Sequence, residues 1–503
     1  MAKIEEGGEV HGVYDVVVVG AGIMGSCAAY QIAKRGKTVL LVEQFDFLHR
    51  RGSSHGESRT IRVTYPEDYY TRMMKEAYKL WEEAESEAGY MVYQRTGHLD
   101  FGSPYNQSLL AVISSLQKEG VPHQILSHKE VAIRFPTLRL PEDSLVIYTS
   151  QGGILRASKA VAMFQALAAK HGAVLRDRAK VLRVSPHWRL PDGSDGILVG
   201  TGRGSALGKA CILAAGAWTP QLVRDISGVE LPIKPLHTSI AYWAVNKINP
   251  DALSPTRGFP SFADYGEPYI YGTPSIEYPG LVKVAVHSGV LCDPNRRSVS
   301  PDMEALKGVV SPWLASHFKG SVKWEAPIMA EGCMYSMTPD QDFILDHLPY
   351  SSKTEMVGIN VLDCKQGFFA QNGRRAGQGR RRETARSQGS LPYLPEEADP
   401  DHGISSETEA FVQNGVESLQ RDQLGICKSQ ILVAAGFSGH GFKMGPLVGR
   451  VMADLALTGV SQGVPLEMFS IQRFTKDAGG NHKLYEAPVK PVPQATIPRT
   501  RSS

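Results

Sequence analysis

The sequence has few cysteines and no excess of charge of either sign. Six cysteines are spread over 503 residues without the dense, even spacing of a secreted disulfide framework, so we expect a reducing compartment. The sequence contains no CxxC pair and no His/Cys cluster at zinc spacing, which argues against a structural metal site. Lys plus Arg number 54 and Asp plus Glu number 51, a formal net charge of +3, so a nucleic-acid binder with a strongly basic face is not expected.

Signals for export or membrane insertion are also missing. The first twelve residues, MAKIEEGGEVHG, lack the basic and apolar regions of a signal peptide. Residues 16–33 carry no charge and are about long enough to span a bilayer, but they open with four valines and hold three glycines. This pattern favours a buried strand followed by a packed helix, so we expect no membrane partner.

The length and composition are those of a globular protein. At about 150 residues per domain, 503 residues correspond to about three domains, or to two with long additions. Hydrophobic residues make up 42%, which is too apolar for a disordered chain. The 50 glycines exceed the usual share of about 7%, and several of them lie in loops of the kind that surround a cofactor.

A glycine-rich turn near the N-terminus predicts a nucleotide site. Residues 14–19, YDVVVV, form a run without alternation, which is typical of a central parallel strand covered on both faces. The turn GAGIMG follows, in which Gly20 allows the sharp bend and Gly22 lets the backbone approach a pyrophosphate. Gly25 lets the following helix, 26–36, pack against the strand, and the amides at that helix N-terminus face the anion.

The acidic residue that completes this unit is Glu43. It closes a second strand, 38–42, and lies 18 residues after Gly25, where it can accept hydrogen bonds from ribose hydroxyls. An acid at this position disfavours the extra phosphate of NADP. The unit predicts a dinucleotide but does not distinguish NAD from FAD.

Blocks farther along the chain carry a family resemblance. Glu43 is followed by QFD and then by RGSSHGESRTIRVTY at residues 51–65; later blocks are AGAW at 215–218, KVAVH at 283–287, CMYSMTPD at 333–340 and GFSGHGFK at 436–443. In this order they resemble the monomeric sarcosine oxidase family of FAD-dependent amine oxidases, which includes plant sarcosine/pipecolate oxidase-like proteins. The resemblance covers residues 13–349 and 429–472.

The resemblance implies an α/β fold, with a Rossmann-type FAD-binding domain interleaved with an α+β substrate domain on a mixed or antiparallel sheet. The expected FAD-binding domain comprises residues 13–66, 152–228, 325–349 and 429–472, and the substrate domain 67–151 and 229–324, with a tail at 473–503. Local patterns agree with this division. They predict amphipathic helices over 69–88 and 157–171, and strands over 233–245 and 280–288.

The activity implied is oxidation of sarcosine or a related N-methyl or secondary amino acid. The C–N bond becomes an imine, which water hydrolyses to glycine and formaldehyde in the case of sarcosine, while O2 is reduced to H2O2. L-Pipecolate oxidation by the same residues is an alternative, and so is a flavin-binding protein without turnover. The expected partners are a small amino acid and O2, and the expected assembly is a monomer.

By the resemblance, a set of cations and aromatic residues handles the substrate. Arg62 and Lys443 bind its carboxylate, since a guanidinium matches a carboxylate bidentately. Arg59 lies over the flavin, and Tyr271 faces the substrate. Period-two alternation puts Lys283 and His287 on one face of a strand. In the family the matching lysine promotes the reaction with oxygen and the matching histidine lines the substrate pocket.

The residues taken alone also permit plainer interpretations. Each arginine is compatible with a surface salt bridge, and the Lys283 strand with an edge strand that has a solvated face. A single cysteine is usually a small buried hydrophobe. By the resemblance, however, Cys333 supplies the thiolate that attaches covalently to the 8-methyl carbon of FAD, and a cationic environment is expected around it.

The remaining expected cofactor contacts come from the same blocks and loops. The full set of expected FAD-binding residues is Gly20, Gly22, Ile23, Met24, Gly25, Glu43, Gln44, Ser53, Ser54, His55, Val181, Gly216, Trp218, Cys333, Met334, Phe437, Gly439, His440, Gly441, Phe442 and Lys443.

The sequence departs from the family between residues 350 and 428. About eighty residues replace a short connection, and they include the arginine-rich run GRRAGQGRRR at 373–382 and an acidic stretch at 395–409. The composition predicts disorder. The segment can be a solvated loop, a site for nucleic acid or for an acidic partner, or translated intron, and it endangers the site only if it displaces the strand at 431–435.

The C-terminal residues, RTRSS, do not form a peroxisomal tripeptide such as Ser-Lys-Leu. We therefore expect an intracellular location, in the peroxisome or the cytosol, with the peroxisome resting on the family alone.

Overall fold

The structure is a computed structural model, and it describes residues 10–318, 320–349 and 430–483. The chain divides into two compact units, residues 1–349 with 429–503 and residues 350–428. All described residues belong to the first unit. The predicted insert lies outside the described residues.

An eight-stranded sheet is built around the valine-rich strand β1 (Val10–Val19). Its last four residues are fully or almost fully buried, and it runs parallel to β2 and β12 on either side. Parallel strands covered on both faces need such unbroken apolar runs. The other strands of this sheet are β2 (Val39–Val42), β9 (Val174–Arg176), β10 (Val181–Arg189), β11 (Asp195–Thr201), β12 (Gly204–Leu213), β19 (Ile344–His347) and β20 (Ile431–Ala435).

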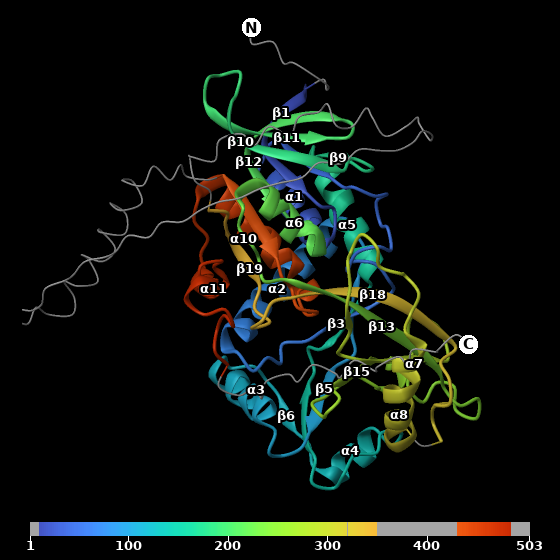
Figure 1. Cartoon of the computed structure of the whole chain (residues 1–503). Helices are drawn as coiled ribbons and strands as arrows, with labels where there is room; N and C mark the ends of the chain where they lie inside the picture. The colour runs from blue at the N-terminus through green and yellow to red at the C-terminus, as the bar shows by residue number, and fades with distance from the viewer. Residues whose placement is uncertain (1–9, 319, 350–429, 484–503) are drawn as a thin grey trace, which may run out of the picture. The chain divides into compact units, whose positions relative to one another are not determined.

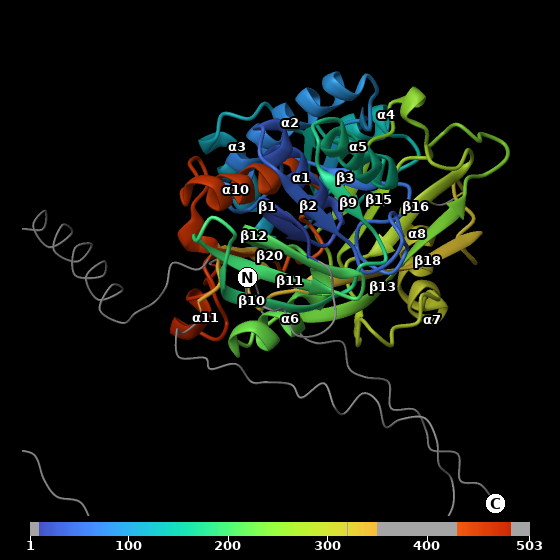
Figure 2. The same cartoon turned by 90° about the horizontal axis from the view of Figure 1, so that it is seen from above.

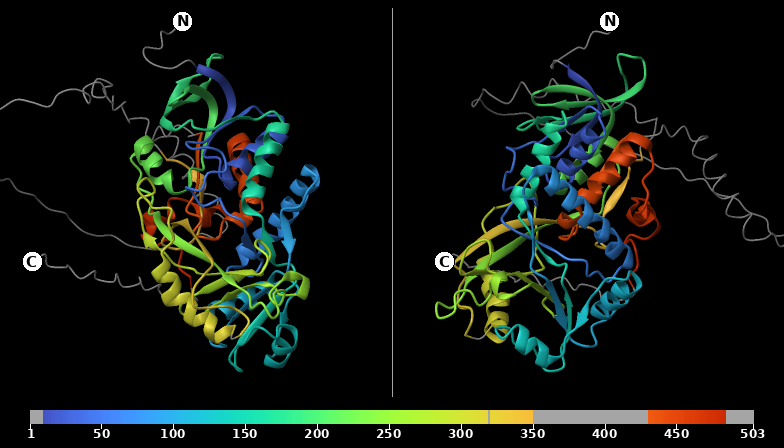
Figure 3. Two further views of the ribbon diagram at one scale, coloured as in Figure 1. Left: turned by 90° about the vertical axis from the view of Figure 1, so that its right-hand side faces the viewer. Right: turned by 180° about the vertical axis from the view of Figure 1, so that it is seen from behind.

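Helices cover this sheet. Helix α1 (Ile23–Lys34) packs against α5 (Ala157–Lys170) and α10 (Gly445–Thr458), and the rear view in Figure 3 shows α1 and α10 side by side. Helix α2 (Asp68–Ala88) packs on α5 and α10. Helix α6 (Thr219–Ser227) contacts β10 and lies away from α1 and α10, as Figure 2 shows.

A nine-stranded sheet forms the second layer, and its long strands β13 (Lys234–Ala244) and β18 (Met329–Met337) pair antiparallel (Figure 1). One face packs Trp243 and Phe262 against Trp313 and Phe318, on or beside α8 (Ser311–His317). The opposite face carries Ile240, Tyr242 and Ala285. The other strands are β5 (His98–Gly102), β6 (Gln124–Ile125), β7 (Leu145–Thr149), β14 (Ser261–Asp264), β15 (Ile270–Thr273), β16 (Leu281–Val286) and β17 (Val290–Leu291).

A three-stranded sheet carries the first predicted arginine. Strand β3 (Arg59–Ile61) pairs with β8 (Gly153–Leu155), which also pairs with β4 (Tyr93–Arg95). The remaining helical segments are α3 (Gln107–Lys118), α4 (His128–Arg134), α7 (Met303–Ala305), α11 (Arg473–Lys476), η1 (Gly216–Trp218), η2 (Pro255–Arg257), η3 (Leu306–Val310), η5 (Phe442–Met444) and η6 (Leu466–Phe469).

The residues that flank segment 350–429 belong to two paired strands. Strands β19 and β20 are antiparallel neighbours with His347 opposite Leu432, and the Leu348 amide donates to the carbonyl oxygen of Ile431 at 2.8 Å. All five residues of β20 are buried, and the strand is also in register with β12. The displacement of this strand, which would disable the site, is therefore not observed. Lengthening a connection from 12 to 80 residues costs only about 1.7 kcal/mol of closure entropy.

The start of the predicted tail is anchored. The side chain of Arg473 donates to Asp340 Oδ2 at 2.7 Å from Nε, and Lys483 donates to Asp342 Oδ1 at 3.0 Å. All four side chains are almost fully buried. Residues 473–483 are thus held against the end of the CMYSMTPD block by buried ion pairs.

The secondary-structure predictions are confirmed to within a few residues at each element end. The predicted helices 69–88 and 157–171 correspond to α2 and α5, and the predicted strands 233–245 and 280–288 to β13 and β16. The uncharged segment 16–33 is the end of β1, the glycine turn and α1. Within the described ranges, no helix has the length and apolar character needed to cross a bilayer. The α/β fold is confirmed, and the division into two domains stays a prediction.

Substituting Gly25 tests the close packing at the start of α1. A Cβ at this position would lie 1.9 Å from the carbonyl oxygen of Gly20. We expect Gly25→Ala to lower the free energy of unfolding by at least about 1–3 kcal/mol, because the backbone must move to relieve the clash. Urea unfolding measures this, with Gly308→Ala as a control, since a Cβ at Gly308 meets no atom within 4 Å. Equal losses in both variants would contradict the packing argument.

Candidate active site

The glycine turn between β1 and α1 brings backbone close to backbone. Gly20 has φ +103°, and a Cβ there would lie 2.5 Å from the carbonyl oxygen of Ala214. The Ile23 amide at the start of α1 donates to Ser54 Oγ at 3.1 Å. The loop that contains Ser54 is thereby held beside a helix N-terminus, which is a favourable position for an anion.

Glu43 is held at the end of β2. Its Oε2 accepts from the Ala21 amide at 2.9 Å, its Oε1 accepts from the Phe45 amide at 3.0 Å, and His49 Nε2 lies 3.4 Å from Oε1. Burial raises the pKa of Glu43, but the bonds from His49, Ala21 and Phe45 outweigh burial and leave its pKa below the usual value. The carboxylate is therefore ionised at neutral pH and fixed where a ribose would lie.

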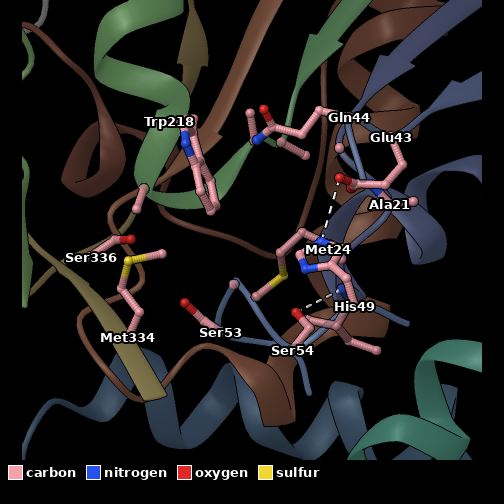
Figure 4. Close-up of a pocket in the computed structure, with 18 of the residues that line it drawn as sticks. Ala21, Met24, Glu43, Gln44, His49, Ser53, Ser54, Trp218, Met334 and Ser336 are labelled. Carbon is pink, nitrogen blue, oxygen red and sulfur yellow. Dashed lines mark hydrogen bonds and ion pairs between the residues drawn. The ribbon is translucent and has the colours of Figure 1, made fainter. Parts of the chain in front are cut away.

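A cavity of about 390 Å³ runs from this turn toward β18 and Cys333. Figure 4 shows Ala21, Glu43 and Ser54 on one side of it, and Trp218, Met334 and Ser336 on another. An elongated, partly apolar cavity that begins at a glycine turn, a helix N-terminus and a fixed carboxylate fits a dinucleotide. The residues present therefore fit FAD.

Most of the predicted FAD-binding residues line this cavity. The predicted residues in the lining are Gly20, Gly22, Ile23, Met24, Glu43, Gln44, Ser53, Ser54, His55, Val181, Gly216, Trp218, Cys333, Met334, Phe437, Gly439, Gly441 and Phe442. Three others lie behind the wall. They are Gly25, His440 and Lys443, of which Gly25 packs under the turn.

Two histidines of the predicted set have different surroundings. His440 contacts the carbonyl oxygen of Gln341 at 3.0 Å and Tyr65 OH at 3.2 Å, and its ring packs against Tyr70. His55 is buried at the cavity wall, and neither of its ring nitrogens has a hydrogen-bond partner within the described part of the chain. Burial and then the charge of Arg59 lower the pKa of His55 to about 3, so this ring is neutral.

Arg59 organises the loop that precedes it. Its guanidinium donates to the carbonyl oxygens of Ser53 at 3.0 Å, His55 at 2.6 Å and Ser58 at 2.6 Å. Within the described ranges it has no ion pair with a carboxylate, so the alternative of a surface salt bridge does not apply. Instead, Nη2 lies 3.8 Å from Sγ of Cys333. The cationic environment expected around this buried thiol is present.

Arg62 and Lys443 converge on one tyrosine. The Arg62 guanidinium lies 4.8 Å from the centre of the Tyr65 ring, and Lys443 Nζ donates to Tyr65 OH at 2.9 Å. Arg62 also donates to Thr64 Oγ1 at 3.2 Å, and Lys443 to the carbonyl oxygen of His440 at 2.9 Å. In the part of the chain that the structure describes, no carboxylate lies within 4 Å of either charge. The buried Asp100 acts on Arg62 through its charge from beyond that distance. Burying cations with no carboxylate in contact is costly, so this pair is suited to bind an anion.

Aromatic residues connect these cations to the cavity. Tyr335 lines the cavity, and its hydroxyl lies 3.3 Å from His287 Nδ1 and 3.5 Å from Tyr271 OH. His287 follows β16, and its ring packs against Tyr269. Burial, followed by the charges of Arg62 and Lys443, lowers the pKa of His287 to about 4. His287 is therefore neutral at pH 7 and adds no third positive charge.

Lys283 lies in the interior of the second sheet. Strand β16 runs between β13 and β15, so it is not the edge strand of the plainer interpretation. Lys283 Nζ donates to the carbonyl oxygen of Ser58 at 3.1 Å and also to Ser58 Oγ, and it lies 3.6 Å from Glu277 Oε1. Ser58 directly precedes Arg59, which lines the cavity. The Lys283 ammonium therefore contacts the residue next to the cavity wall.

The five predicted residues Arg62, Tyr271, Lys283, His287 and Lys443 do not themselves line the cavity. Three residues that connect or position the predicted ones were not predicted from the sequence, namely His49, Glu277 and Tyr335. Tyr335 had a usable signal, because alternation along β18 puts it on the same face as Cys333. Glu277 and His49 lie in connections, where no periodicity identifies a facing partner.

Comparisons of the sequence with known proteins agree with this geometry. Residues 15–373 match the family described as FAD dependent oxidoreductase. The chain is 40% identical to a probable sarcosine oxidase of Arabidopsis thaliana over 94% of this chain and 96% of that protein. It is 32% identical to the peroxisomal sarcosine oxidase of Homo sapiens over 92% of this chain and 96% of that protein.

Solved structures share the fold. NikD, an unusual amino acid oxidase essential for nikkomycin biosynthesis, superposes with a TM-score of 0.65 at 21% identity, over 91% of this chain and 97% of its own. L-Proline dehydrogenase from P. horikoshii gives a TM-score of 0.64 at 20% identity, over 92% of this chain and 98% of its own. With the sequence matches and the cavity described above, this protein belongs to the sarcosine oxidase family of FAD-dependent oxidoreductases.

Proposed function

We propose that this protein is an FAD-dependent oxidase of sarcosine or related N-methyl and secondary amino acids. The observation that carries the proposal is the buried pair Arg62 and Lys443 around Tyr65, with no carboxylate within ion-pair distance among the described residues. This pair lies beside a cavity that fits FAD, and the full-length relatives quoted above are named sarcosine oxidases.

In this proposal the protein positions a small amino acid. Arg62 and Lys443 bind the substrate carboxylate by charge-assisted hydrogen bonds. The neutral ring of His287, with Tyr271 and Tyr335, surrounds the remainder of the substrate, and a neutral imidazole leaves room for an uncharged amine. Orientation of this kind is a large part of what an enzyme contributes when a cofactor carries the redox chemistry.

FAD, when bound, accepts two electrons from the carbon–nitrogen bond and passes them to oxygen, giving an imine and H2O2. Arg59 holds the loop at residues 53–58 and places a positive charge at the cavity wall. Lys283 places a second positive charge one residue behind that wall. Both charges favour the anion that forms first when oxygen is reduced.

We propose that FAD is attached covalently through Cys333. Formation of a thioether bond between Sγ and the 8-methyl carbon removes one hydrogen from the thiol and one from the methyl group, and oxygen takes up the two electrons released. The support is that Cys333 is buried at the cavity wall, with Nη2 of Arg59 3.8 Å from its Sγ.

We also propose a monomer located in the peroxisome or the cytosol. The support is limited to the names of relatives: the human and mouse proteins are called peroxisomal, and the Streptomyces avermitilis protein, 29% identical, is called monomeric.

Peroxide production tests the activity. The purified protein should show flavin absorbance and release H2O2 with sarcosine, and L-pipecolate assayed in parallel ranks the two substrates. Arg62→Met should raise KM for either substrate about 10–100-fold, because a charged hydrogen bond contributes about 1.5–3 kcal/mol. If the protein contains flavin that neither substrate reduces, the substrate assignment is wrong. If the protein shows no flavin absorbance, the proposed FAD-dependent activity is wrong.

Acid precipitation tests the linkage. We expect a yellow pellet from the unsubstituted protein and a colourless pellet with free flavin in solution from Cys333→Ser. Cys292→Ser is the matched control, since Cys292 is a free thiol outside the cavity lining, and its pellet should stay yellow. A colourless pellet from the unsubstituted protein rules the thioether out.

The pH dependence of anion binding tests Lys443. Burial and then the charge of Arg62 lower the pKa of Lys443 well below its usual value of 10.5. Only the ammonium form attracts a carboxylate, so the affinity for acetate, which has no amine to titrate, should fall as pH rises through the Lys443 pKa. Titration of the flavin spectrum with acetate measures this. In Lys443→Met the binding should be weaker and should lack this decline, and a decline that persists would assign it to another group.

A further inference from the structure

Lys283 is buried beside the carboxylate of Glu277, a residue that no sequence motif predicted. The side chains of Lys283 and Glu277 are 4% and 0% exposed, and Nζ lies 3.6 Å from Oε1 of Glu277. Glu277 belongs to the connection between β15 and β16, which folds back so that its side chain reaches the Lys283 side chain in β16. The role of this pair rests on the proposed function, because that role concerns the reaction with oxygen.

Ser58 and Glu277 make different contributions to the ammonium. Ser58 accepts two hydrogen bonds from Nζ, through its carbonyl oxygen and its hydroxyl, but it brings no charge. At 3.6 Å the Glu277 carboxylate acts through its charge and not as a hydrogen-bond acceptor. Among the described residues it is the one carboxylate within 4 Å of Nζ.

The other groups around Lys283 do not replace Glu277. Arg59, on β3, opposes the charge of Lys283, whereas Glu331 and Cys333, both on β18, favour it more weakly than Glu277 does. Tyr242, on β13, is the register partner of Lys283, and its hydroxyl is buried without a hydrogen-bond partner. Burial lowers the pKa of Lys283, and Glu277 is the largest influence in the opposite direction.

Glu277 itself is incompletely satisfied. Its Oε1 accepts a long hydrogen bond from Thr273 Oγ1 at 3.5 Å, and its Oε2 is buried with no hydrogen-bond partner among the described residues. A buried ion pair with unfilled acceptors is a poor device for stability, because apolar side chains of the same volume usually serve at least as well. Fold stability therefore does not account for the Lys283–Glu277 pair. The position of Lys283 behind the cavity wall indicates a functional role instead.

We infer that Glu277 is a positioning residue, which holds the Lys283 ammonium behind Ser58 and Arg59 and keeps it charged for the reaction with oxygen. Glu277 is not one of the residues that line the cavity, and among the described residues its ion pair is with Lys283, so it acts through Lys283.

Separating the two half-reactions tests this inference. In Glu277→Gln holoenzyme, the rate at which reduced enzyme reacts with oxygen should decline at a pH about 1–3 units lower than in the unsubstituted enzyme, since an opposite charge at this distance shifts a pKa by that amount. Anaerobic reduction by sarcosine should change less than about twofold. Glu331→Gln, the matched control, should shift the profile less. In a Lys283→Met background, Glu277→Gln should have no further effect on the oxygen step.

Thermal unfolding supplies a readout that needs no turnover. With Lys283 present, Glu277→Gln should lower the Tm, because the buried ammonium loses its counter-charge. In the Lys283→Met background the same substitution should raise the Tm, because it removes a buried carboxylate that has lost its partner. This change of sign is specific to a charge pair, and a loss of packing would give a decrease in both backgrounds.

The outcomes separate this inference from the proposed function. An unshifted oxygen profile in Glu277→Gln, equal slowing of both half-reactions, or a Tm decrease in both backgrounds would overturn the inference. If sarcosine and L-pipecolate both fail to reduce the flavin, the proposed function fails instead. The Tm cycle and the reaction of chemically reduced enzyme with oxygen still decide the role of Glu277.

Discussion

Arg62 and Lys443 lie buried on either side of Tyr65, and within the described residues neither has a carboxylate within ion-pair distance. Removing a cation from water costs several kcal/mol unless an opposite charge or hydrogen bonds replace the solvent. Here a ring face, a phenol oxygen and carbonyl oxygens offset part of this cost. In the proposed function, an incoming carboxylate offsets the remainder of this cost.

The same constraint explains how neighbouring groups behave. His55 and His287 are neutral because burial and the nearby guanidinium and ammonium groups lower their pKa values to about 3 and 4. The guanidinium of Arg59 donates hydrogen bonds to carbonyl oxygens of its own loop, which bring no opposite charge. Its positive charge therefore acts on the cavity and on Sγ of Cys333. Of the four cations Arg59, Arg62, Lys283 and Lys443, only Lys283 has a carboxylate within 4 Å among the described residues. In the proposed function, Arg62 and Lys443 serve the anionic substrate, and Arg59 and Lys283 lie near the cofactor cavity.

The strands on either side of residues 350–429 are neighbours in the sheet. Strands β19 and β20 pair directly, so the chain leaves and re-enters the sheet at adjacent positions. The buried β20 leads into the turn that carries Phe437 to Lys443, and the ladder with β12 keeps that turn in place. At the other end, the buried pairs of Arg473 with Asp340 and Lys483 with Asp342 tie the following residues to the CMYSMTPD block.

The sequence by itself determined the α/β fold, the glycine turn with Glu43, and the family, because local periodicity and motif order are written along the chain. Period-two alternation predicted that Lys283 and His287 share one face of a strand, whereas in the structure that strand, β16, ends at Val286, one residue before His287. Only the tertiary structure showed that Arg62 and Lys443, 381 positions apart, meet at Tyr65. It also showed that Tyr335 joins His287 to the cavity and that Glu277 faces Lys283. Such contacts depend on how sheets and connections pack in space, and side-chain spacing along one element carries no record of the partner on another.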